Sequence, residues 1–599
     1  MAELLKRTEV PVPMQWDLSV MYKSDAEYES DFAKLPSLVE KVIAFKGHLT
    51  ESAEMLKNAI EAVDELTRLA EKLYTYAHLK SDEDTSNNAN KSRLNKMAGY
   101  FAEVSGATAF FEPEILACNE DKLNELINSD VLKFYKRSLL ELLREKPHTL
   151  SEKEERILGL YSDVMSSSDE IFSVLNDADM SFGKIRDGEG KSIEMSHGNY
   201  RIFMESSDRK LRERAFKRMF STYDKYRNTF AATLDGTTKR HAVNAKLRNY
   251  SSSLAASLAR DNVSEEVYLN LIKVVKSRVP YLSRYLKLRK KVMKLKSLNM
   301  FDLYNPLVKN VKAEYSWDEA KDLVKKALAP LGSDYVKLLD RAFDERWVDV
   351  LENKGKRSGA YSSGCYDSYP YLLLNFNGTL NDVFTLAHEL GHSMHSFYSN
   401  TNQEFHYASY SIFVAEVASI TNELLLFDYL LKNSDNQELR AYLLGQLLDE
   451  MRGTLYRQTM FAEFELEIHK LAEKNTPLSG DLLSELYFKI NNDYYGEVIT
   501  KPNQLIEMEW ARIPHFYYNF YVYKYATGMA AAVQLAQNIL SGDKKKIEAY
   551  FGFLKAGDSK DVLDIMRDAG VDLSTSSPIE AALDYFNSTV AELETLLLK

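Results

Sequence analysis

The amino-acid sequence predicts a mainly α-helical protein with two lobes and a small β-sheet. Its 599 residues exceed what one hydrophobic core usually organises, so at least two lobes are expected. Only 13 prolines and 24 glycines occur in that length, which argues against an all-β protein rich in turns. Long segments such as residues 52–80 place apolar residues at three- and four-residue spacings, with charges on the other face, as amphipathic helices do.

The composition excludes several classes of protein. Hydrophobic residues make up 45% and charged residues 27% of the chain, which are ordinary values for a globular protein. The net charge of −12 would repel phosphate backbones, so we expect no nucleic-acid partner. The sequence contains no run of about 18 apolar residues, so we expect no membrane span. The first twenty residues also lack the apolar stretch of a signal peptide. Because Cys118 and Cys365 lie in unrelated segments, we expect no disulfide framework and a cytoplasmic location.

A domain boundary is predicted near residue 195. The chain before it has a helical pattern almost throughout, until residues 180–195 alternate around Asp187-Gly188-Glu189-Gly190, the composition of a hairpin turn. The helical pattern resumes over residues 206–295, where the last helix carries a run of lysines and arginines that we interpret as a solvated face. We therefore predict an N-terminal helical lobe over residues 1–195 and a second domain over residues 196–599.

A non-helical stretch over residues 359–381 precedes the most informative segment. Glycine and serine are dense at its front, and residues 371–376 are predicted to form a short strand. A strand at the edge of a sheet could align an extended peptide through main-chain hydrogen bonds. Either Thr379 or Asn381 can cap the helix that follows.

That helix contains the motif His388-Glu389-Leu390-Gly391-His392. Histidines four residues apart lie on the same face of a helix, about 6 Å from each other, so both rings can reach one metal ion. Zinc requires neutral nitrogen donors, a third protein ligand and an open position for water. Glu389 is offset around the helix, where it can take a proton from that water as a general base.

Spacing alone leaves the third ligand open. His395 lies on roughly the same helix face as His388 and His392, but one straight helix hardly bends three rings around a tetrahedral ion. On the next predicted helix, Glu416 interrupts an apolar stretch, where a carboxylate is costly unless it is paired or bound to a cation. Glu423 lies seven residues further on the same face and is the rival carboxylate. We favour Glu416.

These residues resemble the oligoendopeptidase F branch of the thimet-oligopeptidase-like zinc metallopeptidases. The similar segments are His388–His392, Phe413–Ser419, the opening segment 7–22, and the C-terminal segments 512–515 and 523–528. In that family the third zinc ligand is a glutamate on the following helix, and Glu416 is the residue that matches. The resemblance implies one Zn²⁺ per chain on His388, His392 and Glu416, a two-lobed helical fold that encloses a substrate channel, and a catalytic domain over residues 196–599.

The aromatic segment 515–525 contains a second set of candidates. Phenol O–H and imidazole N–H groups are donors that could stabilise the charge developing on a peptide carbonyl. The resemblance implies a histidine and two tyrosines seven residues apart over the zinc, which matches His515, Tyr518 and Tyr525. Tyr521 and Tyr523 are the alternative tyrosines.

The expected activity is that of a zinc-dependent endopeptidase, which hydrolyses internal bonds of short, unstructured oligopeptides. Glu389 would deprotonate the zinc-bound water and then pass the proton to the leaving amine. One alternative is an exopeptidase that resembles a dipeptidyl carboxypeptidase, which would need a cation to hold the terminal carboxylate. The other is a non-catalytic peptide-binding scaffold, which would have no need of a base beside the metal ligands. Oligopeptides are the expected partners, with no membrane and no nucleic acid, and the sequence specifies no oligomeric state.

Overall fold

Helices dominate the computed structural model, which describes residues 4–187, 190–308, 314–499 and 504–598. Within this part of the chain the strands form only two small sheets, so the mainly α-helical fold class is confirmed. The chain divides into two compact units, each assembled from three stretches. Unit 1 comprises 1–152, 313–426 and 538–569, and unit 2 comprises 153–312, 427–537 and 570–599. The predicted domain boundary at residue 195 and the enclosed channel stay predictions.

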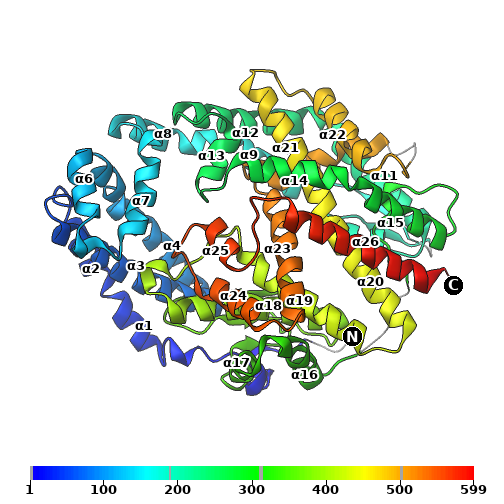
Figure 1. The fold of residues 1–599 in the computed structure, drawn as a ribbon, viewed down its shortest axis with the longest axis horizontal. Helices are drawn as coiled ribbons and strands as arrows, with labels where there is room; N and C mark the ends of the chain where they lie inside the picture. The colour runs from blue at the N-terminus through cyan, green and yellow to red at the C-terminus, as the bar shows by residue number, and fades with distance from the viewer. Residues whose placement is uncertain (1–3, 188–189, 309–313, 500–503, 599) are drawn as a thin grey trace. The chain divides into compact units, whose positions relative to one another are not determined.

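Unit 1 contains a long N-terminal helix pair and the helix with the metal-binding motif (Figure 1). Its elements are α1 (Asp25–Phe32), α2 (Leu35–Ile43), α3 (Ala53–Glu83), α4 (Asn88–Thr108), α5 (Phe111–Leu116), α6 (Glu120–Ile127), α7 (Lys136–Glu145), α16 (Trp317–Leu328), α17 (Ser333–Asp344), β3 (Val348–Asp349), β4 (Tyr361–Ser363), β5 (Tyr371–Leu373), α18 (Leu380–Asn402), α24 (Lys544–Lys555) and α25 (Val562–Asp568). The predicted helix over 52–80 is α3, which Ser52 caps by accepting the backbone N–H of Met55. Helix α4 packs along α3, and α24 packs along α18.

Unit 2 contains the remaining elements, among them the predicted hairpin. They are α8 (Glu152–Met165), α9 (Ser167–Val174), β1 (Lys184–Arg186), β2 (Ser192–Glu194), α10 (His197–Glu205), α11 (Arg209–Lys225), α12 (Arg227–Leu247), α13 (Ser253–Ala259), α14 (Glu265–Ser277), α15 (Val279–Val292), α20 (Gln437–Met451), α21 (Gln458–Glu473), α22 (Gly480–Tyr495) and α26 (Ser577–Leu597). Helices α19 (Ala415–Lys432) and α23 (Tyr523–Leu540) have residues in both units, as does α8 through its first residue. Strands β1 and β2 pair antiparallel, as predicted, although Gly188 and Glu189 of the turn lie outside the described residues.

A three-stranded sheet in unit 1 corrects one prediction. Its strand order is β3-β5-β4, with β5 parallel to β3 and antiparallel to β4. The predicted strand over residues 371–376 is therefore the short central strand β5, whose side chains are all buried, rather than an edge. Among the described residues, β4 pairs on one side only, with β5, and is therefore the edge strand beside α18. Ser362 of β4 contacts Ser393 of α18 through their Oγ atoms at 2.8 Å.

The N-terminal segment is fixed to this sheet by buried charges. Arg7 donates two hydrogen bonds, of 2.8 and 2.5 Å, to the carboxylate of Asp349 in β3. The fully buried ammonium of Lys356 lies 2.7 Å from the same carboxylate. Trp16 donates its indole N–H to Glu83 of α3 at 2.8 Å. The opening segment, which the sequence singled out by resemblance, therefore joins the sheet to α3.

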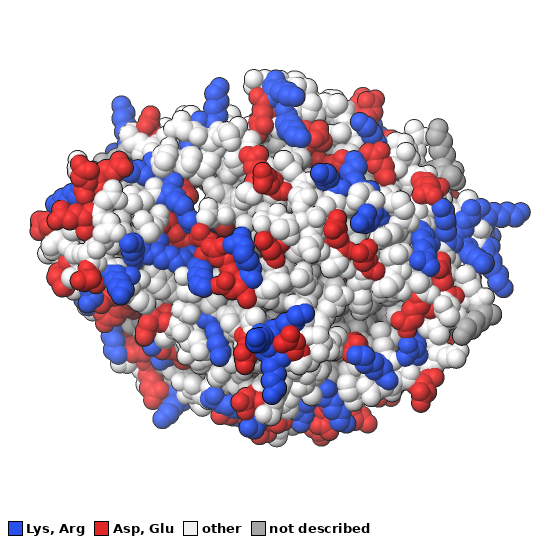
Figure 2. Space-filling model, viewed as in Figure 1, with Lys and Arg blue, Asp and Glu red and all other residues white. Residues whose placement is uncertain are grey.

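Basic and acidic side chains alternate on the surface. The basic residues of α15 are largely matched within unit 2: Arg284 pairs with Glu594, Lys287 with Glu497, and buried Arg289 with Asp449. On the face drawn in Figure 2, Lys and Arg are likewise interspersed with Asp and Glu. None of the described helices has a stretch that is both long and apolar enough to cross a bilayer.

Helix α18 begins and crosses its neighbour in ways that the sequence encodes. Thr379 and Asp382 form a capping box, which confirms Thr379 as the cap. Further along, a Cβ placed on Gly391 would lie 2.5 Å from Cα of Ser419 and 2.8 Å from the carbonyl oxygen of Ala418, both in α19. One turn away, buried Asn422 of α19 donates to the carbonyl of Ala387 at 3.1 Å. Glycine at position 391 therefore allows α19 to lie against the motif helix.

We predict that Gly391→Ala destabilises the protein and weakens the metal site together. The added methyl group meets backbone, which cannot rotate away, and overpacking of this kind costs about 1–3 kcal/mol. Thermal unfolding and metal affinity of the variant would measure both effects, with Gly453→Ala as the control because a Cβ there meets nothing within 4 Å. Wild-type stability and wild-type affinity in Gly391→Ala would contradict this account of the crossing.

Candidate active site

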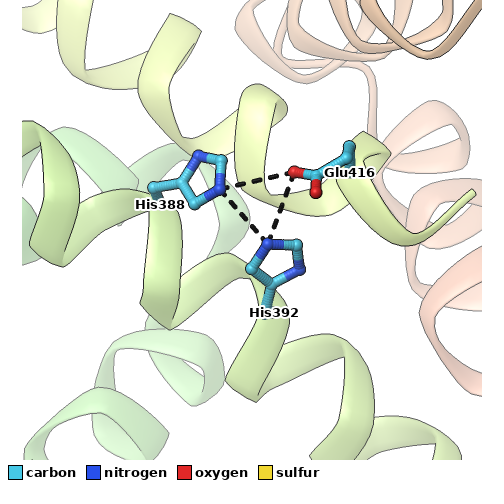
Figure 3. A group of neighbouring side chains, drawn as sticks. All are labelled: His388, His392 and Glu416. Atoms are coloured by element: carbon cyan, nitrogen blue, oxygen red, sulfur yellow. Dashed lines mark hydrogen bonds and ion pairs between the residues drawn. The ribbon is translucent and has the colours of Figure 1, made fainter. Parts of the chain in front are cut away.

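Two histidines and one glutamate converge at the crossing of α18 and α19 (Figure 3). Nε2 of His388 and Nε2 of His392 are 3.2 Å apart. Oε2 of Glu416 lies 3.4 Å from each of these nitrogens. Three donor atoms at such separations can all contact one small cation placed beside them. The structure therefore brings together the three residues that the sequence selected as ligands.

The pKa values of His388 and Glu416 are shifted in opposite directions. Burial alone would lower the pKa of His388, but hydrogen bonds to Glu416 and Glu423 raise it to about 10. Burial alone would raise the pKa of Glu416, but hydrogen bonds from His388 and His392 hold it well below its usual range.

Glu423 contacts the opposite side of the His388 ring. Its Oε1 accepts a hydrogen bond from Nδ1 of His388 at 2.6 Å, which leaves Nε2 directed at His392 and Glu416. Metal-binding histidines are commonly oriented by such a carboxylate on their second nitrogen. The sequence marked Glu423 as a rival ligand, whereas in the structure it contacts the nitrogen of His388 that faces away from Glu416. In the sequence, only its position on the same helix face as Glu416 indicated that Glu423 lies near the histidines.

Glu389 lies beside the cluster without belonging to it. Only 7% of its surface is exposed, and burial raises the pKa of its carboxyl group above the usual value. The neighbouring His388 and His392 oppose that shift in pKa. A buried carboxylate with a raised pKa binds a proton more readily than a solvated one, which suits a general base.

His395 lies outside the cluster of donor atoms formed by His388, His392 and Glu416. It is buried and stacks on Tyr410, with ring centroids 3.7 Å apart and planes 9° apart. Burial and the nearby His392 lower the pKa of His395 to about 3, so this ring is neutral. Tyr410 in turn contacts Ser396 through the two hydroxyl oxygens at 2.9 Å. His395 therefore supports one wall of the site.

Two cavities lie along the same face of α18. The first, of about 390 Å³, is lined by the metal-site residues together with Glu389, Tyr410 and residues 360–362 at β4. The second, of about 220 Å³, shares Ala360 with the first and lies one to two turns towards the start of α18. It is lined by Gly359, Ala360, Leu374, Asn375, Phe376, Asp382 and Thr385. An extended chain that follows β4 would pass both cavities.

The aromatic segment forms a separate cluster in unit 2. The His515 ring lies 5.6, 6.2 and 5.8 Å from the rings of Tyr518, Tyr521 and Tyr525, respectively. The hydroxyl of Tyr525 is 3.3 Å from Nε2 of His515. Burial and the nearby Arg457 lower the pKa of His515, which keeps its ring neutral at physiological pH. Tyr523 instead is buried and packs on Tyr268, so Tyr521, and not Tyr523, is the third tyrosine beside His515.

Comparisons with known proteins agree over the whole chain. Residues 202–585 match the model of peptidase family M3, and residues 114–182 match the model of oligopeptidase F. Oligopeptidase PepF of Bacillus subtilis is 44% identical over 100% of this chain and 89% of its own length. Group B oligopeptidase PepB of Streptococcus agalactiae is 40% identical over 99% of this chain and 98% of its own. The crystal structure of oligoendopeptidase-F from Enterococcus faecium is 36% identical, with a TM-score of 0.74 over 96% of this chain and 99% of that one.

We predict that Glu423→Ala weakens the binding of a divalent metal by about 10- to 100-fold, because His388 then loses the group that orients its ring. Glu423→Gln should lose less, since its carbonyl oxygen still accepts the Nδ1–H. Competition with a chromophoric chelator measures both affinities, and Glu438→Ala, at an exposed position of α20, is the control. Equal affinities in Glu423→Ala and wild type would contradict the orienting role.

Proposed function

Because the chain belongs to the oligoendopeptidase F group of peptidase family M3, and is therefore a metalloendopeptidase, we propose that it is a zinc enzyme acting on short, unstructured oligopeptides. One zinc ion per chain would be held by His388, His392 and Glu416. The observation that carries the proposal is the triangle of donor atoms, 3.2, 3.4 and 3.4 Å on its sides. Family membership favours the endopeptidase over the exopeptidase and scaffold alternatives.

The donor set fits zinc in size and in chemistry. Ligands about 2.0–2.1 Å from a tetrahedral zinc ion are about 3.3–3.4 Å from one another, close to the separations found between these three residues. Two imidazoles and one carboxylate are also the ligands of several catalytic zinc sites, which keep one position open. Zinc held there would supply Lewis acidity, which acidifies water and polarises a peptide carbonyl.

Glu389 is proposed to move the proton during peptide hydrolysis. It follows His388 directly on α18, so its carboxylate borders the same cavity as the ligands. Its raised pKa increases its affinity for the proton that the attacking water must lose. The same carboxyl group can then donate that proton to the amine that leaves.

The cluster around His515 is proposed to supply hydrogen-bond donors to the carbonyl oxygen as it becomes negative. A neutral imidazole carries one N–H, and each phenol carries one O–H, so His515, Tyr518 and Tyr525 carry three donors, one of which is shared in the contact between Tyr525 and His515. Tyr521 belongs to the same cluster and would be a fourth. Such groups stabilise the transition state more than the bound substrate, so their loss should lower kcat rather than raise KM.

Substrate binding is proposed to use the free edge of β4. Main-chain hydrogen bonds to an edge strand do not depend on the side chains of the peptide, which suits an enzyme that degrades varied oligopeptides. The cavity of about 220 Å³ beside α18 is large enough for one substrate side chain. We further propose a cytoplasmic location, which the two separate free cysteines support.

Glu389→Gln should retain zinc and lose peptide cleavage. The amide has nearly the same shape as the carboxylate but cannot accept a proton, and general-base catalysis contributes about 10²- to 10⁴-fold to a rate. Metal analysis and cleavage of an internally quenched peptide measure the two properties. Normal kcat in a preparation free of wild-type enzyme would rule out the proposed role of Glu389.

Tyr525→Phe should lower kcat by about 100-fold with little change in KM, since removal of one transition-state donor typically has this effect. Tyr523→Phe is the matched control, because Tyr523 lies two residues away on α23 but packs in the core of unit 2. Steady-state kinetics of the two variants would decide the matter. Equal losses in both, or a loss in Tyr523→Phe alone, would contradict the assignment of Tyr525.

A further inference from the structure

A left-handed turn lies between two of the tyrosines in the His515 cluster. Asn519 and Phe520 have φ values of 50° and 58°, and they separate Tyr518 from Tyr521. Asparagine is tolerated in this conformation, but a bulky side chain such as phenylalanine is an outlier there. Strained backbone of this kind persists only where the surrounding structure holds it, and it is frequent at active sites.

A buried glutamate holds the strained residue. Glu465 lies in α21 with none of its surface exposed, and its Oε1 accepts the backbone N–H of Phe520 at 2.6 Å. Its other oxygen, Oε2, is buried and finds no hydrogen-bond partner among the described residues. Burying a carboxyl group with a single hydrogen bond destabilises a protein, so stability does not explain a glutamate at this position.

The ring of Phe520 and the carbonyl of Asn519 are held as well. The Phe520 ring contacts His469, with centroids 4.3 Å apart. His469 donates through Nδ1 to the carbonyl of Glu465 at 2.8 Å, and Nδ1 of His241 lies 3.1 Å from its Nε2. The pKa of each histidine is lowered by burial, so both are neutral and can form this chain with their protons on Nδ1. Ser257 donates to the Asn519 carbonyl at 2.7 Å.

We propose that Glu465 is a positioning residue for catalysis, which holds the Asn519–Phe520 turn so that Tyr518 and Tyr521 stand beside His515. The inference rests on the proposed function of that cluster as a set of transition-state donors. Among the described residues, Glu465 forms no hydrogen bond with the tyrosines beside His515 or with the candidate metal ligands. It acts through the backbone of Phe520, the residue directly before Tyr521.

The test compares two substitutions at position 465 in the zinc-loaded enzyme. Glu465→Leu removes the acceptor and keeps an apolar volume, so kcat should fall about 10- to 100-fold while KM changes less than about threefold. Its melting temperature should stay close to that of the wild type, because the unpaired N–H of Phe520 costs stability while the removal of a poorly bonded buried carboxyl group restores it. Glu465→Gln keeps an acceptor for the Phe520 N–H and should retain kcat within about threefold. Glu467→Leu, at a partly exposed site on the same helix, is the control.

Each outcome decides for or against the proposal. A fall in kcat with unchanged melting temperature, rescued by glutamine, supports it, and wild-type kcat in Glu465→Leu overturns it. Equal losses in the leucine and glutamine variants also overturn it, because the acceptor would then be irrelevant. If Glu465→Leu does not fold, Glu465→Met has a similar volume, lacks the strong acceptor and is judged by the same criteria.

A coupling measurement separates this proposal from the proposed function. If Glu465 acts through the tyrosines, adding Glu465→Leu to a Tyr518→Phe/Tyr521→Phe enzyme should lower kcat less than about twofold further. A further fall in kcat as large as the one that Glu465→Leu causes in the otherwise wild-type enzyme would overturn the positioning role. Wild-type kcat in the Tyr518→Phe/Tyr521→Phe enzyme would refute the donor role of the tyrosines, and the positioning role with it. A lowered kcat in the Tyr518→Phe/Tyr521→Phe enzyme, together with wild-type kcat in Glu465→Leu, would refute the positioning role alone.

Discussion

The backbone contact between α18 and α19 is the constraint on which the metal site depends. The three candidate ligands come from two helices, so their convergence requires that the helices approach closely and in one register. Gly391 permits the approach, because any side chain there would meet the backbone at Ser419. The hydrogen bond from Asn422 to the carbonyl of Ala387 fixes the register one turn further along. Glu416 lies one turn before Ser419 and so meets the two histidines.

The charges gathered at this crossing indicate why a cation belongs there. Glu389, Glu416 and Glu423 all lie around His388, and with neutral histidines the group would carry three negative charges. Partial burial strengthens such repulsion, because water screens it less than at the surface. A divalent cation bound at the crossing would offset two of these negative charges and would contact the donor atoms of His388, His392 and Glu416.

The sequence predicted the elements whose cause is local. The spacing of His388 and His392 places both rings on one helix face, Thr379 precedes a helix as a cap does, and Glu416 interrupts an apolar stretch that needs a reason for a charge. Long amphipathic periodicity likewise predicted the helical fold. What depends on contacts between distant segments could not be predicted. Strand β4 has only three residues and becomes an edge through pairing with β5, and each unit is assembled from three separate stretches.

Roles within the site also depended on such contacts. Glu416 and Glu423 share a helix face, so only the angle between the helices decides which one reaches Nε2 and which one reaches Nδ1 of His388. His395 has the spacing of a ligand but is turned into a stack with Tyr410. The left-handed residues Asn519 and Phe520 break the periodicity of the aromatic segment, which is why Tyr521 rather than Tyr523 stands beside His515.

The most direct test of the central claim is cleavage of a quenched oligopeptide blocked at both ends, before and after removal of metal with a chelator. We predict internal cleavage by the untreated enzyme, loss of cleavage on chelation, and full recovery when one equivalent of zinc per chain is added back. The chelated Glu416→Ala enzyme should not recover at that zinc concentration. Cleavage that persists without metal, or recovery that does not depend on Glu416, would contradict a zinc site built from His388, His392 and Glu416.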